Sequence, residues 1–323
     1  MKNNFVFKLV TTLLIILMFS LSISIFSVSA TTEEITENQT VEEVVQEEKI
    51  LMYDAETGET TEIDMEQIRQ NIIMTYSNNN IQLNRLPAYI PNSNLEINNG
   101  EYDIAPNASS SDFHLISEIN AFPNTAICRV GSNGGNGSGF LIGPNLLLTN
   151  AHCVMNEKDN SIYAEWIAYP GFNNKDVYEP GMQAGWSKII YSSNWLNSHS
   201  DEDDWCLCIL QEDLGNKMGY FGAVAYGTEA EMNNLEVRAV GYPDEYGDSY
   251  DQYYTLGRIK TTFSGKFDMT TPLADGMSGG PITTTADTGT IIGIAKGNYK
   301  YRPNTYIGVR ITQTIIDVIR TYR

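Results

Sequence analysis

The sequence contains few of the residues on which several classes of protein depend. Its 323 residues include four cysteines, too few for a small fold that disulfides hold together. Twenty residues are basic and 40 are acidic, which gives a formal net charge of −20. This charge repels the phosphate backbone of nucleic acids, and no basic patch interleaved with aromatic residues offsets it. The sequence therefore argues against nucleic-acid binding.

The few cysteines do not suggest a disulfide framework. Cys206 and Cys208 lie two residues apart in an apolar run, so on a strand both point the same way, and we expect them to be buried. Cys128 and Cys153 are the one pairing that the sequence leaves open.

Long apolar runs are missing except at the amino terminus. Residues 1–30 have a lightly basic start, a long apolar run and the small residues Val28-Ser29-Ala30, as a signal peptidase requires. We expect a signal peptide there. An uncleaved anchor is the alternative, because the run approaches the ~18 residues that can span a bilayer. We expect a secreted protein with no membrane contact after signal cleavage.

Most of the excess acidic charge lies in residues 31–107, which are rich in Glu, Thr and Asn and poor in aromatic residues. Such a composition is typical of a solvated, poorly packed segment. We expect a poorly ordered acidic propeptide, with a short helix at residues 65–76. A disordered linker is the alternative.

From about residue 112 the chain consists of short apolar runs separated by Gly, Pro, Asn and Asp. Runs of this length and composition predict strands, and their spacing predicts an all-β sandwich or barrel. Residues 311–323 differ, because Ile311, Ile315, Ile316 and Ile319 recur at helical spacing. We therefore expect a carboxy-terminal helix.

Histidine is scarce too, and this shortens the search for a catalytic base. Of the three histidines, His152 lies in "LLLTNAHCV", directly after an apolar run. Asp204 lies in "HSDEDDWCLCIL" and directly precedes an apolar run that could hold its carboxylate in place. The acidic cluster around it could instead only solvate a loop or bind calcium, although no EF-hand spacing supports calcium.

Ser278 stands in "LADGMSGGPI", where three glycines surround it. Glycine tolerates positive φ, so this stretch can turn sharply and present its amides, which suits either a nucleophile or a plain bend between strands. A serine hydroxyl needs an imidazole to take its proton and a carboxylate to hold that imidazole, and His152 and Asp204 supply both types.

The order of these residues along the chain separates the classes of serine hydrolase. In α/β-hydrolases the histidine follows the serine, but no histidine follows Ser278. The subtilisin order places the acid before the histidine, and its α/β fold does not suit the all-β pattern. The order that remains is His152, Asp204, Ser278.

These motifs resemble the chymotrypsin-like serine endopeptidases, in particular the bacterial branch that contains the glutamyl endopeptidases. The resemblance covers about residues 112–323 and rests on "LLLTNAHCV", "DWCLCIL" and "GMSGGP". It implies two six-stranded antiparallel β-barrels with an active site in the cleft between them. It also implies that residues 108–323 form the protease domain.

The resemblance also implies a role for each site residue. His152 would be the general base and then the general acid, Asp204 would orient it, and Ser278 would be the nucleophile. The backbone amides of Gly276 and Ser278 would form the oxyanion hole.

Two departures bear on maturation and on disulfides. Met277 stands where trypsin has the aspartate that binds the new amino terminus, so activation by that ion pair is not expected. Gly137 stands where the animal enzymes have the cysteine that would bridge Cys153, so we expect that disulfide to be absent.

Other departures bear on specificity. The resemblance places Leu273, Ala295 and Lys296 in the specificity pocket. Ala295 replaces the histidine that glutamyl endopeptidases use, and Leu273 replaces a small hydroxyl residue, which leaves a preference for glutamate open. Lys296 would either recognise an acidic substrate side chain or be a solvated lysine at the cleft.

We therefore expect a secreted, extracellular serine endopeptidase of a Gram-positive bacterium, made as a preproenzyme. It would be a monomer that acts on proteins or peptides and needs no cofactor or metal, with calcium unsupported. The alternative is a catalytically inactive homologue that serves as a secreted binding or surface protein.

Overall fold

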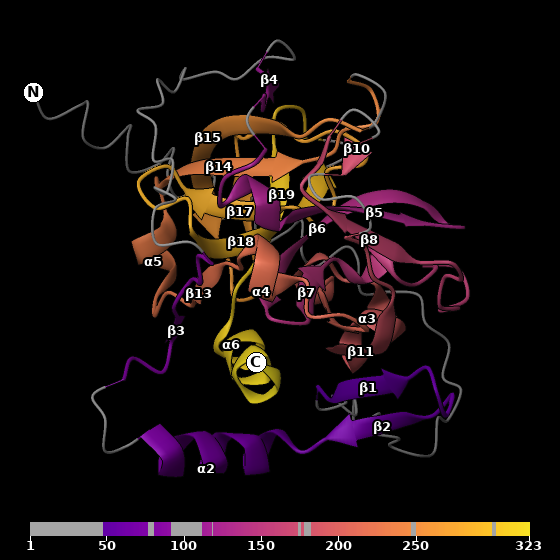
Figure 1. Cartoon of the computed structure of the whole chain (residues 1–323). Coiled ribbons are helices and arrows are strands. Elements are labelled where there is room, and N and C mark those ends of the chain that lie inside the picture. The colour runs from indigo at the N-terminus through magenta and orange to yellow at the C-terminus, as the bar shows by residue number, and fades with distance from the viewer. Residues whose placement is uncertain are drawn as a thin grey trace, which may run out of the picture. The chain divides into compact units, whose positions relative to one another are not determined.

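A computed structural model gives the fold of most of the chain (Figure 1). The residues that it describes are 48–76, 81–91, 112–117, 119–173, 176–177, 182–246, 250–298 and 302–323. The predicted signal peptide at residues 1–30 lies outside them. No helix in these described ranges is long and apolar enough to cross a membrane.

The first sheet has eight strands in the described residues, all paired antiparallel in the order β2-β1-β11-β12-β7-β6-β5-β8. The strands are β1 (Ile50–Asp54), β2 (Thr60–Ile63), β5 (Ile127–Ser132), β6 (Gly135–Gly143), β7 (Leu146–Thr149), β8 (Ile167–Pro170), β11 (Trp186–Ser192) and β12 (Cys206–Leu210). Every residue of β7 is buried, as its unbroken apolar run predicts.

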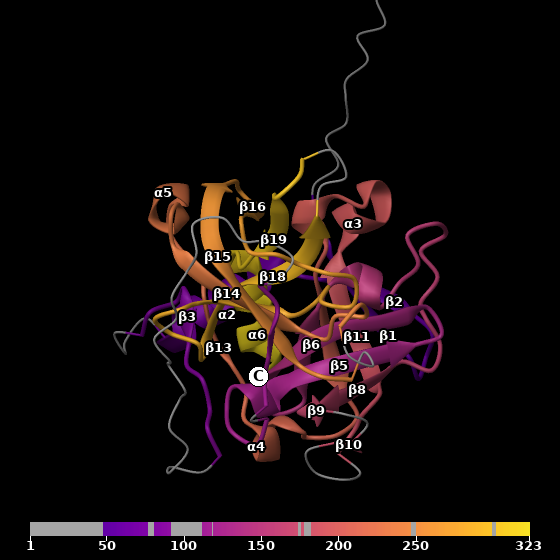
Figure 2. The ribbon, with the colours of Figure 1, turned by 90° about the horizontal axis from the view of Figure 1, so that it is seen from above.

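The second sheet contains a closed ring of six strands in the order β17-β14-β15-β16-β19-β18, because β18 pairs back with β17. The ring strands are β14 (Glu236–Gly241), β15 (Tyr253–Thr262), β16 (Lys266–Met269), β17 (Pro281–Thr284), β18 (Thr290–Asn298) and β19 (Tyr306–Arg310). Three further strands extend it, namely β3 (Arg85–Leu86), β4 (His114–Leu115) and β13 (Gly222–Val224). Figure 2 shows the strands of the two sheets on opposite sides of the view.

The all-β fold is confirmed, with one difference from the expected pair of closed barrels. The second sheet closes, whereas the first is an open path of strands. Between β8 and the segment before β11, an isolated bridge joins Ala168 to Ala184 in the described residues. The first sheet therefore curls toward a barrel without a continuous closing ladder.

Short helices and turns complete the described chain. They are α2 (Met65–Tyr76), α3 (Ser193–Ser198), α4 (Gly215–Met218), α5 (Glu229–Met232), α6 (Gln313–Tyr322), the 3₁₀ turns η1 (Asn124–Ala126), η2 (Ala151–Cys153) and η3 (Asp201–Asp203), and the strand pair β9 (Phe172–Asn173) and β10 (Asp176–Val177). The predicted carboxy-terminal helix is confirmed as α6. It starts after Thr312, whose hydroxyl caps the Ile315 amide, and it buries its isoleucine face.

Part of the predicted propeptide is folded, which its composition did not indicate. The helix expected at residues 65–76 is confirmed as α2. Strand β1 pairs along its whole length with β11, and β3 pairs with β13, so one segment covers an edge of each sheet. An ion pair of 3.5 Å joins Arg69 of α2 to Asp317 of α6. The expectation of a poorly ordered region is therefore wrong for residues 48–76 and 81–91.

Candidate active site

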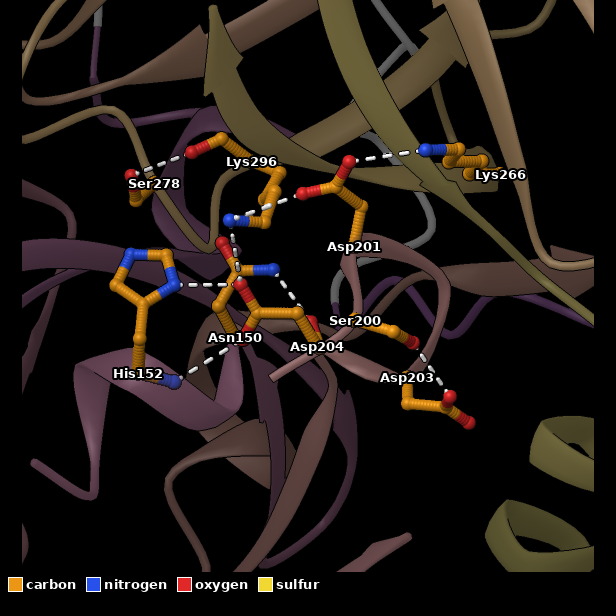
Figure 3. Close-up of polar contacts among 9 residues, drawn as sticks. All are labelled: Asn150, His152, Ser200, Asp201, Asp203, Asp204, Lys266, Ser278 and Lys296. Atoms are coloured by element: carbon orange, nitrogen blue, oxygen red, sulfur yellow. Dashed lines mark hydrogen bonds and ion pairs between the residues drawn. The ribbon is translucent and has the colours of Figure 1, made fainter. Parts of the chain in front are cut away.

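His152 is held at the end of a fully buried strand. It lies in η2, directly after β7, and its side chain is 25% exposed. The backbone amide of His152 donates to Oδ1 of Asp204 at 3.0 Å, and its ring atom Nδ1 lies 2.6 Å from Oδ2 of the same carboxylate. The ring is thus fixed on one edge, and its other nitrogen lies on the side of Ser278 (Figure 3).

Strand pairing explains why Asp204 meets this histidine. Cys206 of β12 is paired with Thr149 of β7, so the residue just before β12 lies beside the residues just after β7. The side-chain amide of Asn150 donates to the Asp204 carbonyl at 2.6 Å, which fixes the backbone at this junction. Asp204 is completely buried.

The electrostatics of this pair follow from burial and mutual charge. Burial alone would raise the pKa of Asp204, but the charges of His152 and Lys296 outweigh it and hold that pKa below its usual value. Burial likewise works to lower the pKa of His152, and the Asp204 carboxylate outweighs it and raises that pKa above the usual value. Asp204 is therefore ionised and stabilises a proton on the imidazole.

Ser278 lies in a tight turn between β16 and β17. The turn places Gly276 at φ +87° and Gly279 at φ +88°, in the region that favours glycine. A Cβ atom on Gly279 would lie 2.0 Å from the Ser138 carbonyl oxygen, so this position has no room for a side chain. The Ser278 hydroxyl donates to the Lys296 carbonyl at 2.8 Å, and it must turn to offer its proton to His152.

The same turn leaves two amides free. Neither the Gly276 nor the Ser278 N–H donates to a protein group among the described residues. The carbonyl that precedes Gly276 accepts from the Asp244 amide at 2.8 Å, and the one that precedes Ser278 accepts from the Gly280 amide at 3.0 Å. The N–H and C=O of a trans peptide point in opposite directions. The N–H groups of Gly276 and Ser278 therefore point away from Asp244 and Gly280, whose amides bond the preceding carbonyls.

A cavity of about 900 Å³ opens beside this site. Its lining includes His152, Ser278, Leu273 and Lys296, together with Phe113, Glu157, Asp201, Glu245, Tyr246, Pro272, Ala274, Asp275, Gly297, Asn298, Asn304, Tyr306 and Ile307. His152 and Ser278 therefore face a cavity that is large enough for a substrate side chain.

Two of the three residues expected in the specificity pocket line this cavity. Leu273 and Lys296 line the cavity. Ala295 is fully buried in the core, and it is not one of the described residues that line the cavity. The idea of a solvated Lys296 is wrong, because its side chain is 18% exposed. Its ammonium lies 3.4 Å from Asp201 and 3.5 Å from Asp204 (Figure 3).

The cysteine predictions are largely confirmed. All four cysteines are free, so the Cys128–Cys153 pairing that the sequence left open does not occur. Cys206 and Cys208 are buried, as expected. A Cβ atom on Gly137 would lie 2.9 Å from the Cys153 sulfur, so this glycine does occupy the place of a bridging cysteine.

Two residues that support the site were not found from the sequence. Ser138 is fully buried, and its hydroxyl donates to the Gly276 carbonyl at 2.8 Å while it accepts from the Tyr242 amide at 3.0 Å. Asp201 was grouped with the solvated acids, yet it holds Lys296 and also Lys266, at 2.9 Å. Neither contact has a local sequence signal, because each joins segments far apart in the chain.

The described residues contain no group of three or more His, Cys, Asp or Glu side chains arranged to hold a metal ion. The expectation that no metal or cofactor is needed stays a prediction.

Comparison with known proteins extends these observations. A family model for a trypsin-like peptidase domain matches residues 137–294, which include His152, Asp204 and Ser278. The glutamyl endopeptidase of Bacillus licheniformis is 25% identical over 229 residues, which are 69% of this chain and 70% of that protein. A protein of Bacillus subtilis named extracellular metalloprotease is 26% identical over 217 residues, covering 64% of this chain and 66% of that one.

Solved structures agree on the fold. A Glu endopeptidase matches with a TM-score of 0.59 at 21% identity, over 65% of this chain and 96% of that one. A thermostable serine protease, AL20, from an extremophilic microorganism matches with a TM-score of 0.52 at 16% identity, over 62% and 98%. The fold is chymotrypsin-like, and the sequence matches a trypsin-like peptidase domain and is similar to a glutamyl endopeptidase, as its motifs predicted.

Proposed function

We propose that this protein is an endopeptidase that cleaves peptide bonds with His152, Asp204 and Ser278 as its catalytic triad. The observation that carries the proposal is the buried carboxylate of Asp204, 2.6 Å from Nδ1 of His152, at a cavity that Ser278 also lines. An ionised carboxylate can only accept hydrogen bonds, so Nδ1 carries the proton and the other ring nitrogen is left as a base.

The reaction would proceed in two halves. The Ser278 oxygen attacks the scissile carbonyl carbon while His152 takes the hydroxyl proton, and the imidazolium then gives that proton to the leaving amine. This yields an acyl-enzyme on Ser278. Water, activated by His152 in the same way, then hydrolyses the ester and restores the serine.

The free amides of Gly276 and Ser278 would stabilise the oxyanion in both halves. A donor of this kind contributes on the order of 10²–10³ in rate. The hydrogen bond from Ser138 to the Gly276 carbonyl supports this role, because it fixes the neighbouring peptide of the turn.

The proposal includes export and maturation. Residues 1–30 would direct secretion and residues 31–107 would be removed as a propeptide, which would leave residues 108–323 as an extracellular, monomeric enzyme. One relative is named an extracellular metalloprotease, which supports secretion. Proteins or peptides would be the substrates, and the glutamyl endopeptidase relative suggests a preference for cleavage after glutamate.

Hydrolysis of casein by the purified full chain and by its Ser278→Ala variant tests the proposal. We expect hydrolysis by the first and at least a 10⁴-fold loss in the second, because no other group would form the acyl-enzyme. Because the second relative is named a metalloprotease, addition of EDTA tests whether this protein needs a metal ion. We expect the rate of casein hydrolysis to stay unchanged. A chain that has lost residues 31–107 and still cleaves no casein would favour the alternative of a binding protein, and loss of activity in EDTA would overturn the metal-free reaction.

A further inference from the structure

Lys296 contacts two members of the proposed triad at once. Its backbone carbonyl accepts a hydrogen bond from the Ser278 hydroxyl at 2.8 Å, and its ammonium lies 3.5 Å from Oδ2 of Asp204. That same Oδ2 atom lies 2.6 Å from the His152 ring. One oxygen of the buried carboxylate is therefore shared between an imidazole and a lysine.

A local irregularity of strand β18 goes with this position. The ladder between β18 and β19 shifts register between Ala295 and Gly297, so Lys296 has no paired residue opposite it. A bulge of this kind re-aims a side chain, and bulges are common beside active sites. The side chain of Lys296 lies beside the Asp204 carboxylate and not in open solvent.

Lys296 is itself held by a second carboxylate. Asp201 lies 3.4 Å from the Lys296 ammonium through one oxygen and 2.9 Å from the Lys266 ammonium through the other. Charges thus alternate from Lys266 through Asp201 and Lys296 to Asp204 (Figure 3). The two carboxylates raise the pKa of Lys296 against the effect of burial, which would lower it, so the ammonium stays charged.

A buried carboxylate without a counter-charge is costly, and breaking a buried pair is strongly destabilising. In the resting state of a serine protease the histidine must be neutral to act as a base, so it cannot be the counter-ion of Asp204 at that moment. Among the residues that the structure describes, Lys296 is the one cation other than His152 that lies within ion-pair distance of the Asp204 carboxylate.

We propose that Lys296 is a positioning residue of the triad, whose ammonium keeps the Asp204 carboxylate ionised and in place while His152 is neutral. This rests on the proposed function. The cation then belongs to the triad and is not the group that recognises an acidic substrate side chain. Because it competes with the imidazolium for the same oxygen, it also makes protonation of His152 harder.

Other titratable groups act on the same residues and stay constant in the test. Glu157 acts on Lys296, and Cys153 and Tyr163 neighbour His152. The acidic limb of the kcat/KM profile against pH reports the protonation of the free enzyme's base. We expect Lys296→Met to move this limb to higher pH by about one unit, since loss of a nearby cation stabilises the imidazolium.

Three comparison variants make the shift specific. Lys296→Arg keeps the cation and should keep the limb within a few tenths of a unit. Asp201→Asn removes a negative charge and should move the limb to lower pH. Lys188→Met removes a lysine that is ion-paired with Asp54 elsewhere, at 2.8 Å, and should leave the limb unchanged.

A second readout does not need hydrolysis. The His152 ring can be titrated by NMR in the Ser278→Ala background, where Lys296→Met should raise its midpoint by the same amount. This result would sustain the positioning role even if casein were not cleaved. An unchanged midpoint of the His152 titration would overturn the proposal. It would also be overturned if Lys296→Met left the acidic limb in place but greatly lowered the rate of cleavage after Glu relative to cleavage after Gln, because Lys296 would then act on the substrate.

Discussion

The Nδ1 atom of His152 lies 2.6 Å from Oδ2 of Asp204, and no part of the Asp204 side chain is exposed to solvent. The amide of His152 bonds the other oxygen of the same carboxylate, so both the ring and its backbone are tied to one buried group. This relationship fixes the tautomer of the imidazole.

Asp204→Asn should lower kcat by about 10³–10⁴-fold at neutral pH, because an asparagine amide can donate to Nδ1 and stabilise the wrong tautomer. Steady-state kinetics with a peptide substrate checks this. Asp203→Asn is the matched control, since the Asp203 carboxylate accepts from Ser192 and Ser200 and does not touch His152 (Figure 3). Equal losses in both variants would contradict the role given to Asp204.

The pH dependence of activity has a definite sign. Only neutral His152 can take the serine proton, and the Asp204 carboxylate raises the pKa of His152 above its usual value of about 6.5. Activity should thus be full above this raised pKa and fall about tenfold per pH unit below it. A kcat/KM profile that stays flat down to pH 5 would be inconsistent with His152 as the base.

Ser138 should matter for catalysis although it lies outside the triad. Ser138→Ala removes the donor to the Gly276 carbonyl and the acceptor of the Tyr242 amide, both buried, which should cost about 1–3 kcal/mol of stability. We also expect kcat to fall about tenfold with little change in KM, because the oxyanion amide is less firmly held. Ser132→Ala, at the end of β5, is the control, because its hydroxyl bonds the local turn at Gly134 and Gly135.

The folded part of the predicted propeptide should stabilise the chain. Ile72 is the buried residue of α2, and its neighbour Ile73 is 56% exposed. Ile72→Asp should lower the melting temperature of the full chain by roughly 5 °C, because it buries a charge without a partner, whereas Ile73→Asp should leave it unchanged. Similar melting temperatures for the two variants would mean that α2 does not dock.

Much of the site could be predicted from the sequence because each residue of the proposed triad is attached to a strong local pattern. His152 follows the apolar run of β7, Asp204 precedes that of β12, and Ser278 stands among glycines that the turn requires at positive φ. The fold follows from the same patterns, since short apolar runs bounded by turn residues specify strands.

What could not be predicted depends on pairings between distant segments. The composition of residues 48–63 is that of a solvated tail, but backbone hydrogen bonding to the open edge of β11 outweighs it. The direction of the Lys296 side chain depends on a bulge and on two carboxylates more than ninety residues earlier. Ser138 shows no pattern in its own segment, because its hydroxyl bonds Tyr242 and Gly276, which flank strands of the second sheet.

The most direct test of the catalytic claim is the site of covalent labelling by an organophosphonate. The mature protein, obtained by export and processing of the full chain, is incubated with the probe at pH 8, digested, and its peptides are mapped by mass spectrometry. We predict a single adduct on Ser278, which is lost in Ser278→Ala and reduced in Asp204→Asn. No adduct, or an adduct on another residue with hydrolysis intact in Ser278→Ala, would contradict the assignment of this serine as the nucleophile.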